Sequence, residues 1–161
     1  MMARMQRGLA DLTEAAFAPF GTVTPLAPGA AALRLVAEIE NARPAARLEV
    51  DFTTVPALAL PHSATLLECH RANSQSFIPL RVARYLVVVT PAGDQPDLTQ
   101  ARAFAARGDQ AITYRAGIWH HPLAALDAPG FFAILTFRAG DADDTTLFPL
   151  AMPLMLHAGT R

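Results

Sequence analysis

Apolar and polar side chains alternate along residues 47–54. On one face of an extended chain this places Leu48, Val50 and Phe52, and on the other Arg47, Glu49 and Asp51. A period of two predicts a half-buried strand, with the apolar face toward the core.

Two further segments, residues 85–90 and 131–137, are apolar on both faces and predict central strands of a sheet. Clusters of Pro, Gly, Asp and Asn separate the apolar segments, roughly every 8 to 12 residues, as in all-β domains. Residues 33–41 fit either a strand or a helix, and both interpretations stay open. The chain has no internal repeat, low-complexity tract or linker, so residues 1–161 are expected to form one domain, a β-sandwich or small barrel.

One short helix is predicted near the N-terminus, over residues 12–17. Asp11 is expected to cap it, with Glu14 completing an arrangement like a capping box. Pro19 and Gly21 then end the helix.

Composition narrows the class of protein. The chain has 161 residues, of which 52% are hydrophobic and 17% charged, against a usual charged fraction of about 25%. A domain of this size has a limited interior, so part of the apolar excess is expected at the interface of a two-fold homodimer. The net charge of −1 and the lack of a basic run argue against nucleic acid and anionic membranes as partners, which favours a small-molecule ligand.

The cellular compartment follows from three observations. The lone Cys69 cannot form an internal disulfide, as is typical of a reducing compartment. Asp11 and Glu14 interrupt residues 1–20, which therefore do not resemble a signal peptide. The longest apolar runs are too short to span a bilayer, so we expect a cytoplasmic protein.

Two polar segments stand out on this mostly apolar chain. Residues 67–79 contain Glu68, His70 and Gln75, and residues 114–122 contain the only tryptophan beside His120 and His121. Side chains alternate along a strand, so Glu68 and His70 share a face. The same rule puts His120 and His121 on opposite faces, and only one of them can face the interior of a barrel.

Both segments resemble the metal-binding motifs of cupins. Gly117-x-x-His120 resembles the second motif, with Arg115 in the position of its proline. Glu68-x-His70-x-x-x-x-Gln75 resembles the first, with Glu68 replacing a histidine and Gln75 replacing the glutamate. The order of the two motifs predicts an all-β, cupin-type double-stranded β-helix, or jelly-roll barrel, with a short N-terminal helix. It also predicts that Glu68, His70, Gln75 and His120 converge inside the barrel, with His121 pointing away.

Taken whole, the chain is similar to the ureidoglycolate lyase family, once called ureidoglycolate hydrolases. The matching segments run in order: residues 14–21, 68–79, 86–89, 96–98, 102–104 and 114–123. Two polar segments of the family differ here. An Asn-Gly and an Arg-Tyr-His-Asp-like stretch are missing from residues 26–41, and Asp-Arg with a later Asn-Cys is missing after Phe137.

The resemblance implies a lyase that cleaves ureidoglycolate to glyoxylate and urea during allantoin and purine nitrogen catabolism. The reaction needs a base, an acid and a cation for the substrate carboxylate, and His120 and His70 are the catalytic candidates. The substrate-binding candidates are Gln75, Ser74, Arg71, Arg115 and Arg138. Glu68, His70, Gln75 and His120 could hold a divalent ion such as nickel, manganese or zinc.

Simpler roles are open for several of these residues. His121 could lie at the barrel surface or a dimer contact, and Trp119 could fill the core or an interface. Ser74 and Asn73 could close a turn, and Cys69 could be a small buried apolar residue. Asp143 and Asp144 are expected to solvate a turn, although carboxylates at a barrel rim could also bind a cation. Two other functions stay open: a cupin enzyme acting on another small hydroxy- or keto-acid, and a non-catalytic small-molecule-binding cupin.

Overall fold

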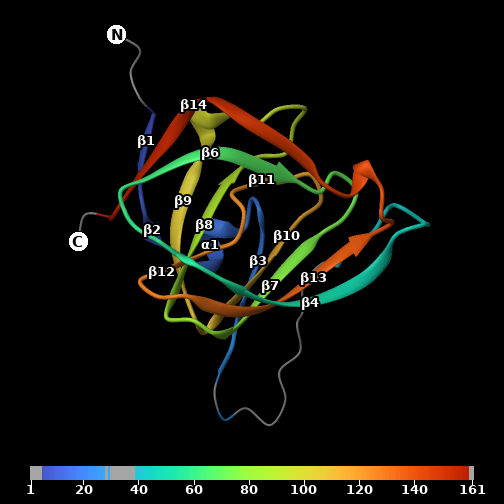
Figure 1. The fold of residues 1–161 in the computed structure, drawn as a ribbon, viewed down its shortest axis with the longest axis horizontal. Coiled ribbons are helices and arrows are strands. Elements are labelled where there is room, and N and C mark those ends of the chain that lie inside the picture. Colours follow the sequence, from blue (N-terminus) through green and yellow to red (C-terminus); the bar gives the residue numbers. More distant parts are fainter. Residues whose placement is uncertain (1–4, 28, 30–38, 160–161) are drawn as a thin grey trace.

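Two β-sheets face each other and enclose a barrel (Figure 1). The computed structural model describes residues 5–27, 29 and 39–159. In this part of the chain, the larger sheet has the strand order β1-β14-β6-β11-β8-β12-β5, with β9 paired to β8 and β2 paired to β9. The smaller sheet has the order β3-β10-β7-β13-β4. Consecutive strands alternate between the sheets in much of the chain, which is the cupin-type jelly roll that the motifs predicted.

The strands of the larger sheet are β1 (Gln6–Gly8), β2 (Ala10–Asp11), β5 (Ala57–Leu58), β6 (His62–Cys69), β8 (Arg84–Thr90), β9 (Arg102–Arg107), β11 (Trp119–His120), β12 (Ala124–Leu126) and β14 (Thr146–His157). Those of the smaller sheet are β3 (Gly21–Pro25), β4 (Arg47–Val55), β7 (Gln75–Arg81), β10 (Gln110–Tyr114) and β13 (Gly130–Arg138). The helical elements are α1 (Glu14–Phe17) and two 3₁₀ turns, η1 (Leu98–Gln100) and η2 (Ala142–Asp144). In Figure 1, β6 and β14 cross the top of the view, and β4 and β13 lie at the lower right.

The short N-terminal helix is present, but its cap differs from the prediction. Thr13 is the N-cap, and its hydroxyl oxygen accepts a hydrogen bond from the amide of Ala16 at 3.2 Å. Asp11 cannot cap α1 because it belongs to β2, where it pairs with Ala105 of β9. The helix places Phe17 in the core between the sheets.

The predicted central strand at residues 85–90 is buried on both faces. Tyr85, Val87 and Val89 point into the core between the two sheets. Leu86 and Val88 pack into a second core on the outer side of the larger sheet. The strand at residues 131–137 also lies inside its sheet, between β7 and β4.

The orientation predicted for β4 is wrong. Its apolar side chains face outward, where Leu48 and Val50 are each 48% exposed and Phe52 is 67% exposed. Its polar face lies on the inner side of the sheet, because Glu49 pairs with the buried Thr136 and Val55 joins the core between the sheets. Alternation separates two faces of a strand but carries no information about which of them meets the other sheet.

Only residues 39–41 of the segment that fitted either a strand or a helix are described, and residues 33–38 lie outside the described part. Asn41 forms an isolated antiparallel bridge with Asn73, in the loop that carries part of the polar segment. Among the described residues, none of the helices is long and apolar enough to cross a membrane.

Candidate active site

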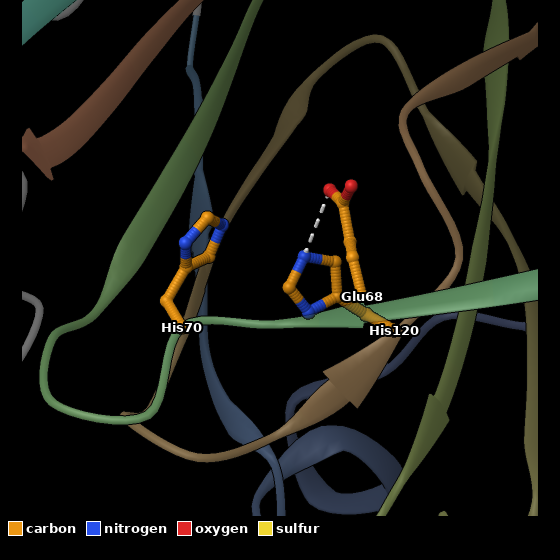
Figure 2. Close-up of side chains that lie close together, drawn as sticks. All are labelled: Glu68, His70 and His120. Carbon is orange, nitrogen blue, oxygen red and sulfur yellow. Dashed lines mark ion pairs between the residues drawn. The ribbon is translucent and has the colours of Figure 1, made fainter. Parts of the chain in front are cut away.

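Glu68, His70 and His120 meet inside the barrel (Figure 2). Glu68 lies on β6 and is the direct antiparallel partner of His120 on β11, so their side chains emerge on the same side of the sheet. His70 follows the end of β6 and turns its ring toward the other two. One possible ligand atom of each residue lies within 4.8 Å of the others. Both imidazoles are buried, with His120 1% and His70 5% exposed.

Glu68 and His120 form a close carboxylate–imidazole contact, which is an ion pair when the imidazole is protonated. The distance between Glu68 Oε1 and His120 Nε2 is 3.4 Å. Burial acts to raise the pKa of the Glu68 carboxyl, but the hydrogen bond and charge of His120 bring that pKa below its usual value. The carboxylate is therefore ionised at neutral pH and faces an imidazole.

Gln75 completes the cluster from the opposite sheet. Its amide nitrogen donates to Thr136 Oγ1 at 3.1 Å, which turns its Oε1 toward His120 Nε2, also at 3.1 Å. The other ring nitrogen of His120 lies 3.0 Å from the carbonyl oxygen of Ile118. Both nitrogens of His120 thus face oxygen acceptors, and the oxygens of Glu68 and Gln75 share the same nitrogen, Nε2.

The hydrogen bonding of His70 differs from that of His120. Its Nδ1 donates to the backbone carbonyl of Asp144 at 2.8 Å, which leaves Nε2 with a lone pair. Nε2 is buried and lacks a hydrogen-bond partner among the described residues. Burial lowers the pKa of the His70 imidazole, and the charge of His120 lowers it further. A neutral ring with a free lone pair can accept a proton or bind a metal ion.

Two aromatic rings pack against the imidazole of His120. Tyr114 stacks on it with ring centroids 4.2 Å apart and planes tilted by 15°. Phe77 meets the same imidazole edge-on at 6.4 Å. Sequence reasoning missed Tyr114, although its position two residues after Ile112 on a buried strand indicated that it faces the interior.

The donor set fits a divalent ion. One carboxylate, one amide oxygen and two imidazoles are ligands that nickel, manganese or zinc accept. The unpartnered Nε2 of His70 supports this fit, because a buried nitrogen without a partner is costly unless something occupies its lone pair.

Ser74, also predicted to bind substrate, lies in the loop before β7. Its hydroxyl accepts from the backbone amide of Glu40 at 2.9 Å, and its own amide donates to the Glu40 carbonyl at 3.0 Å. Those contacts pin residues 39–41 against the loop. The Glu40 carboxylate in turn accepts from the amide of Ala116 at 3.4 Å.

The three predicted arginines lie in different places. Arg71 covers the Trp119 ring at 5.2 Å and donates to the Asp94 carbonyl at 3.0 Å. Arg115 donates to the Ala18 carbonyl at 2.8 Å.

Arg138 instead lies on the inner face of β13. It is two residues beyond Thr136, which contacts Gln75, and therefore points to the same side. Its Nη1 contacts Glu49 at 2.8 Å and Asp51 at 2.6 Å.

His121 does not join the cluster. Its Nε2 lies 3.3 Å from Nε2 of His62, while its Nδ1 donates to the Pro122 carbonyl. Trp119 fills the second core and donates to the Gly93 carbonyl, and Cys69 is buried there with its pKa raised to about 11 by burial. Asp143 is exposed in its turn, as expected, whereas Asp144 is buried, so the expectation was wrong for Asp144.

A jelly-roll barrel with inward-facing histidine, carboxylate and amide groups at the ends of facing strands defines a cupin-type protein. The family model for ureidoglycolate lyase matches residues 8–156. A ureidoglycolate lyase of Azotobacter vinelandii is 38% identical over 156 residues, covering 91% of this chain and 94% of that protein. Ureidoglycolate lyases of Burkholderia cepacia and Pseudomonas entomophila are 41% and 33% identical, covering 86% and 91% of this chain and 83% and 93% of theirs. The chain belongs to the ureidoglycolate lyase family.

Proposed function

We propose that this protein is a lyase that cleaves ureidoglycolate to glyoxylate and urea, as one step of allantoin and purine nitrogen catabolism. The observation that carries the proposal is the pairing of two unlike histidines in one buried cluster. His70 has a free Nε2 lone pair, whereas His120 sits between the oxygens of Glu68 and Gln75. The identity of the substrate is inferred from membership of the ureidoglycolate lyase family.

The two histidines match the two proton transfers of the reaction. In the cleavage, the carbinol hydroxyl gives up its proton, the C–O bond becomes a carbonyl, and the electrons of the C–N bond pass to the departing nitrogen. His70 Nε2 accepts the hydroxyl proton, and His120 donates a proton to that nitrogen. Glu68 Oε1 lies 3.4 Å from His120 Nε2 and orients this ring for the proton transfer.

The same residues could hold a divalent ion such as nickel, manganese or zinc. Glu68, His70, Gln75 and His120 would be its ligands. When bound there, such an ion would supply Lewis acidity at the substrate hydroxyl and carboxylate oxygens.

Arg138 is our first choice for the group that binds the substrate carboxylate. It shares the inner face of β13 with Thr136, and its two ion pairs, to Glu49 and Asp51, both use Nη1. The remaining edge of the guanidinium suits a carboxylate through two parallel hydrogen bonds. Arg71, Arg115 and Ser74 remain further substrate-binding candidates in this proposal.

We also propose that the protein acts as a homodimer of single-domain subunits in the cytoplasm. The outward face of β4, β13 and β7 carries exposed or partly exposed apolar side chains: Leu48, Val50, Phe52, Ile78, Leu80, Phe131, Leu135 and Phe137. A second copy is the occupant that best explains this surface, because self-association would bury it through the same patch on both subunits. The buried, unpaired thiol of Cys69 suits a reducing compartment.

Glyoxylate release from ureidoglycolate, coupled to a glyoxylate reductase, tests the activity. Release must exceed the spontaneous decay of the substrate, measured in parallel without protein. Release at the background rate, both without added metal and with nickel, manganese or zinc, would refute the lyase assignment. Turnover of another small hydroxy- or keto-acid, or ligand-induced melting shifts without turnover, would then favour one of the two alternatives.

A further inference from the structure

A partly exposed ion-pair network lies behind His70, on the side of the ring that carries Nδ1. His70 Nδ1 donates to the backbone carbonyl of Asp144, which ends the η2 turn. The side chain of the same Asp144 is bound by Arg43, from the segment before β4. Asp144 thus links two segments far from it in the sequence, one through its carbonyl to His70 and one through its carboxylate to Arg43.

The carboxylate of Asp144 is held by three donors. The amides of Ala139 and Gly140 donate to its two oxygens at 2.7 and 2.8 Å, and Arg43 Nη1 donates at 2.7 Å. These bonds, with the Ala139 amide foremost, lower the pKa of Asp144 to about 2. Through these three bonds the side chain ties the turn back on itself.

Arg43 also contacts the other end of the η2 turn. Its Nη2 contacts both carboxylate oxygens of Asp141, at 2.6 and 2.8 Å, at the other end of η2. Side chains of Arg43 and Asp144 are only 17% and 13% exposed, so the pair is shielded from solvent more than a surface ion pair. With both ends of the turn held, the Asp144 carbonyl has a set direction.

That direction decides which nitrogen of His70 carries the proton. A carbonyl accepts hydrogen bonds only, so neutral His70 must place its proton on Nδ1. Its lone pair then lies on Nε2, which faces the cluster with Glu68 and His120. If the carbonyl moved away, the proton could shift to Nε2, and the ring could neither accept a proton nor bind a metal ion there.

We propose that Arg43 and Asp144 are positioning residues that hold His70 in its Nδ1–H tautomer. Neither residue touches the reacting atoms, and each acts through the η2 backbone. The inference rests on the proposed function, because this tautomer serves catalysis only if His70 accepts the substrate proton. The tautomer itself can be observed without any substrate.

The test is a long-range ¹H–¹⁵N NMR spectrum of the protein with ¹⁵N-labelled histidine, at a pH where His70 is neutral. The protein should be metal-free, and the His70 signals are assigned with His70→Asn. The wild type should show the Nδ1–H pattern for His70. Arg43→Gln and Asp144→Asn should shift the signals toward a mixture of tautomers, and Arg43→Lys should restore much of the Nδ1–H form. Asp143→Asn, an exposed change in the same turn, is the matched control and should leave the spectrum unchanged.

Kinetics provide the second measurement. Loss of an outer hydrogen-bond partner typically costs about 10- to 100-fold in activity or metal affinity, so kcat should fall by roughly that factor in Arg43→Gln, with a small change in KM. An Nε2–H tautomer in the wild type, or an unchanged tautomer in folded Arg43→Gln and Asp144→Asn, would overturn the proposal. If the tautomer shifts occur as expected but the wild type releases no glyoxylate, the positioning role of Arg43 and Asp144 stands and the lyase assignment fails.

Discussion

His120 and Glu68 face each other directly across β11 and β6, and their side chains close to 3.4 Å inside the barrel. This pairing joins the two polar segments of the chain through backbone register rather than through a flexible loop. Because both residues lie on strands of one sheet, their separation is set by the ladder. His120 can therefore act on a substrate with its partner already in place.

Replacing His120 by Asn should remove the acid while keeping a side chain of similar reach. General acid–base catalysis contributes about 10²–10⁴-fold, so kcat should fall by a factor of that order with little change in Tm. Steady-state glyoxylate release measures it. His121→Asn is the control, because His121 pairs with His62 outside the cluster and should retain activity. Equal rates in His120→Asn and the wild type would show that another residue is the acid.

Replacing Arg138 by Gln should weaken binding of the substrate carboxylate. Hydrogen bonds to a charged group contribute on the order of 2 kcal/mol, which corresponds to a rise in KM of roughly 30-fold. Arg138→Lys should recover part of this loss, since it keeps the charge but not the fork of two donors. Arg107→Gln, which breaks an exposed ion pair with Asp109, is the control. An unchanged KM in Arg138→Gln would move the carboxylate site to Arg71 or Arg115.

Metal binding can be measured apart from turnover. Isothermal titration of metal-free protein with Ni²⁺, Mn²⁺ and Zn²⁺ should show one site per chain, and His70→Asn should weaken it at least 10-fold. His157→Asn controls for adventitious binding by a histidine elsewhere. If none of the three ions binds the wild type, the metal part of the proposal fails while the proton transfers assigned to His70 and His120 remain testable.

Assembly through the apolar face of β4 predicts a sharp mutational effect. Phe52→Glu places a charge at the most exposed large apolar side chain of this face and should convert the proposed dimer to a monomer in sedimentation velocity experiments. Leu147→Glu changes an equally apolar, 57% exposed side chain on β14 of the other sheet and should leave the dimer intact. A wild type that is already monomeric at micromolar concentration would contradict the assembly.

The stability of the Asp144 network should depend on acid pH. The folded pKa of Asp144, about 2, lies below its ordinary value of 3.8, so its stabilising contribution is present above 3.8 and disappears as the pH falls toward 2. Asp144→Asn should therefore unfold more readily than the wild type at pH 6, and the difference should narrow below pH 4. Urea titrations across this range measure it, with Asp143→Asn as the control. A difference that is constant across the range would mean that ionisation of Asp144 does not contribute.

Much of the candidate site could be predicted because local rules determine it. The period of two placed Glu68 and His70 on one face and separated His120 from His121, and the motif order placed all of them in a jelly roll. The structure brings Glu68, His70, Gln75 and His120 together, as predicted. These relationships survive folding because alternation is a property of the extended backbone itself.

Other features depended on contacts between distant segments. Thr13 rather than Asp11 caps α1 because β2 recruits Asp11 into a ladder with β9. The apolar face of β4 turned outward because its polar face lines the barrel beside Thr136 and Arg138. The proton on His70 is directed by a carbonyl from the η2 turn. The sequence by itself determined which side chains share a face; only the tertiary structure decided which face is inside and which atoms meet there, because hydrogen bonds and packing between remote strands set those choices.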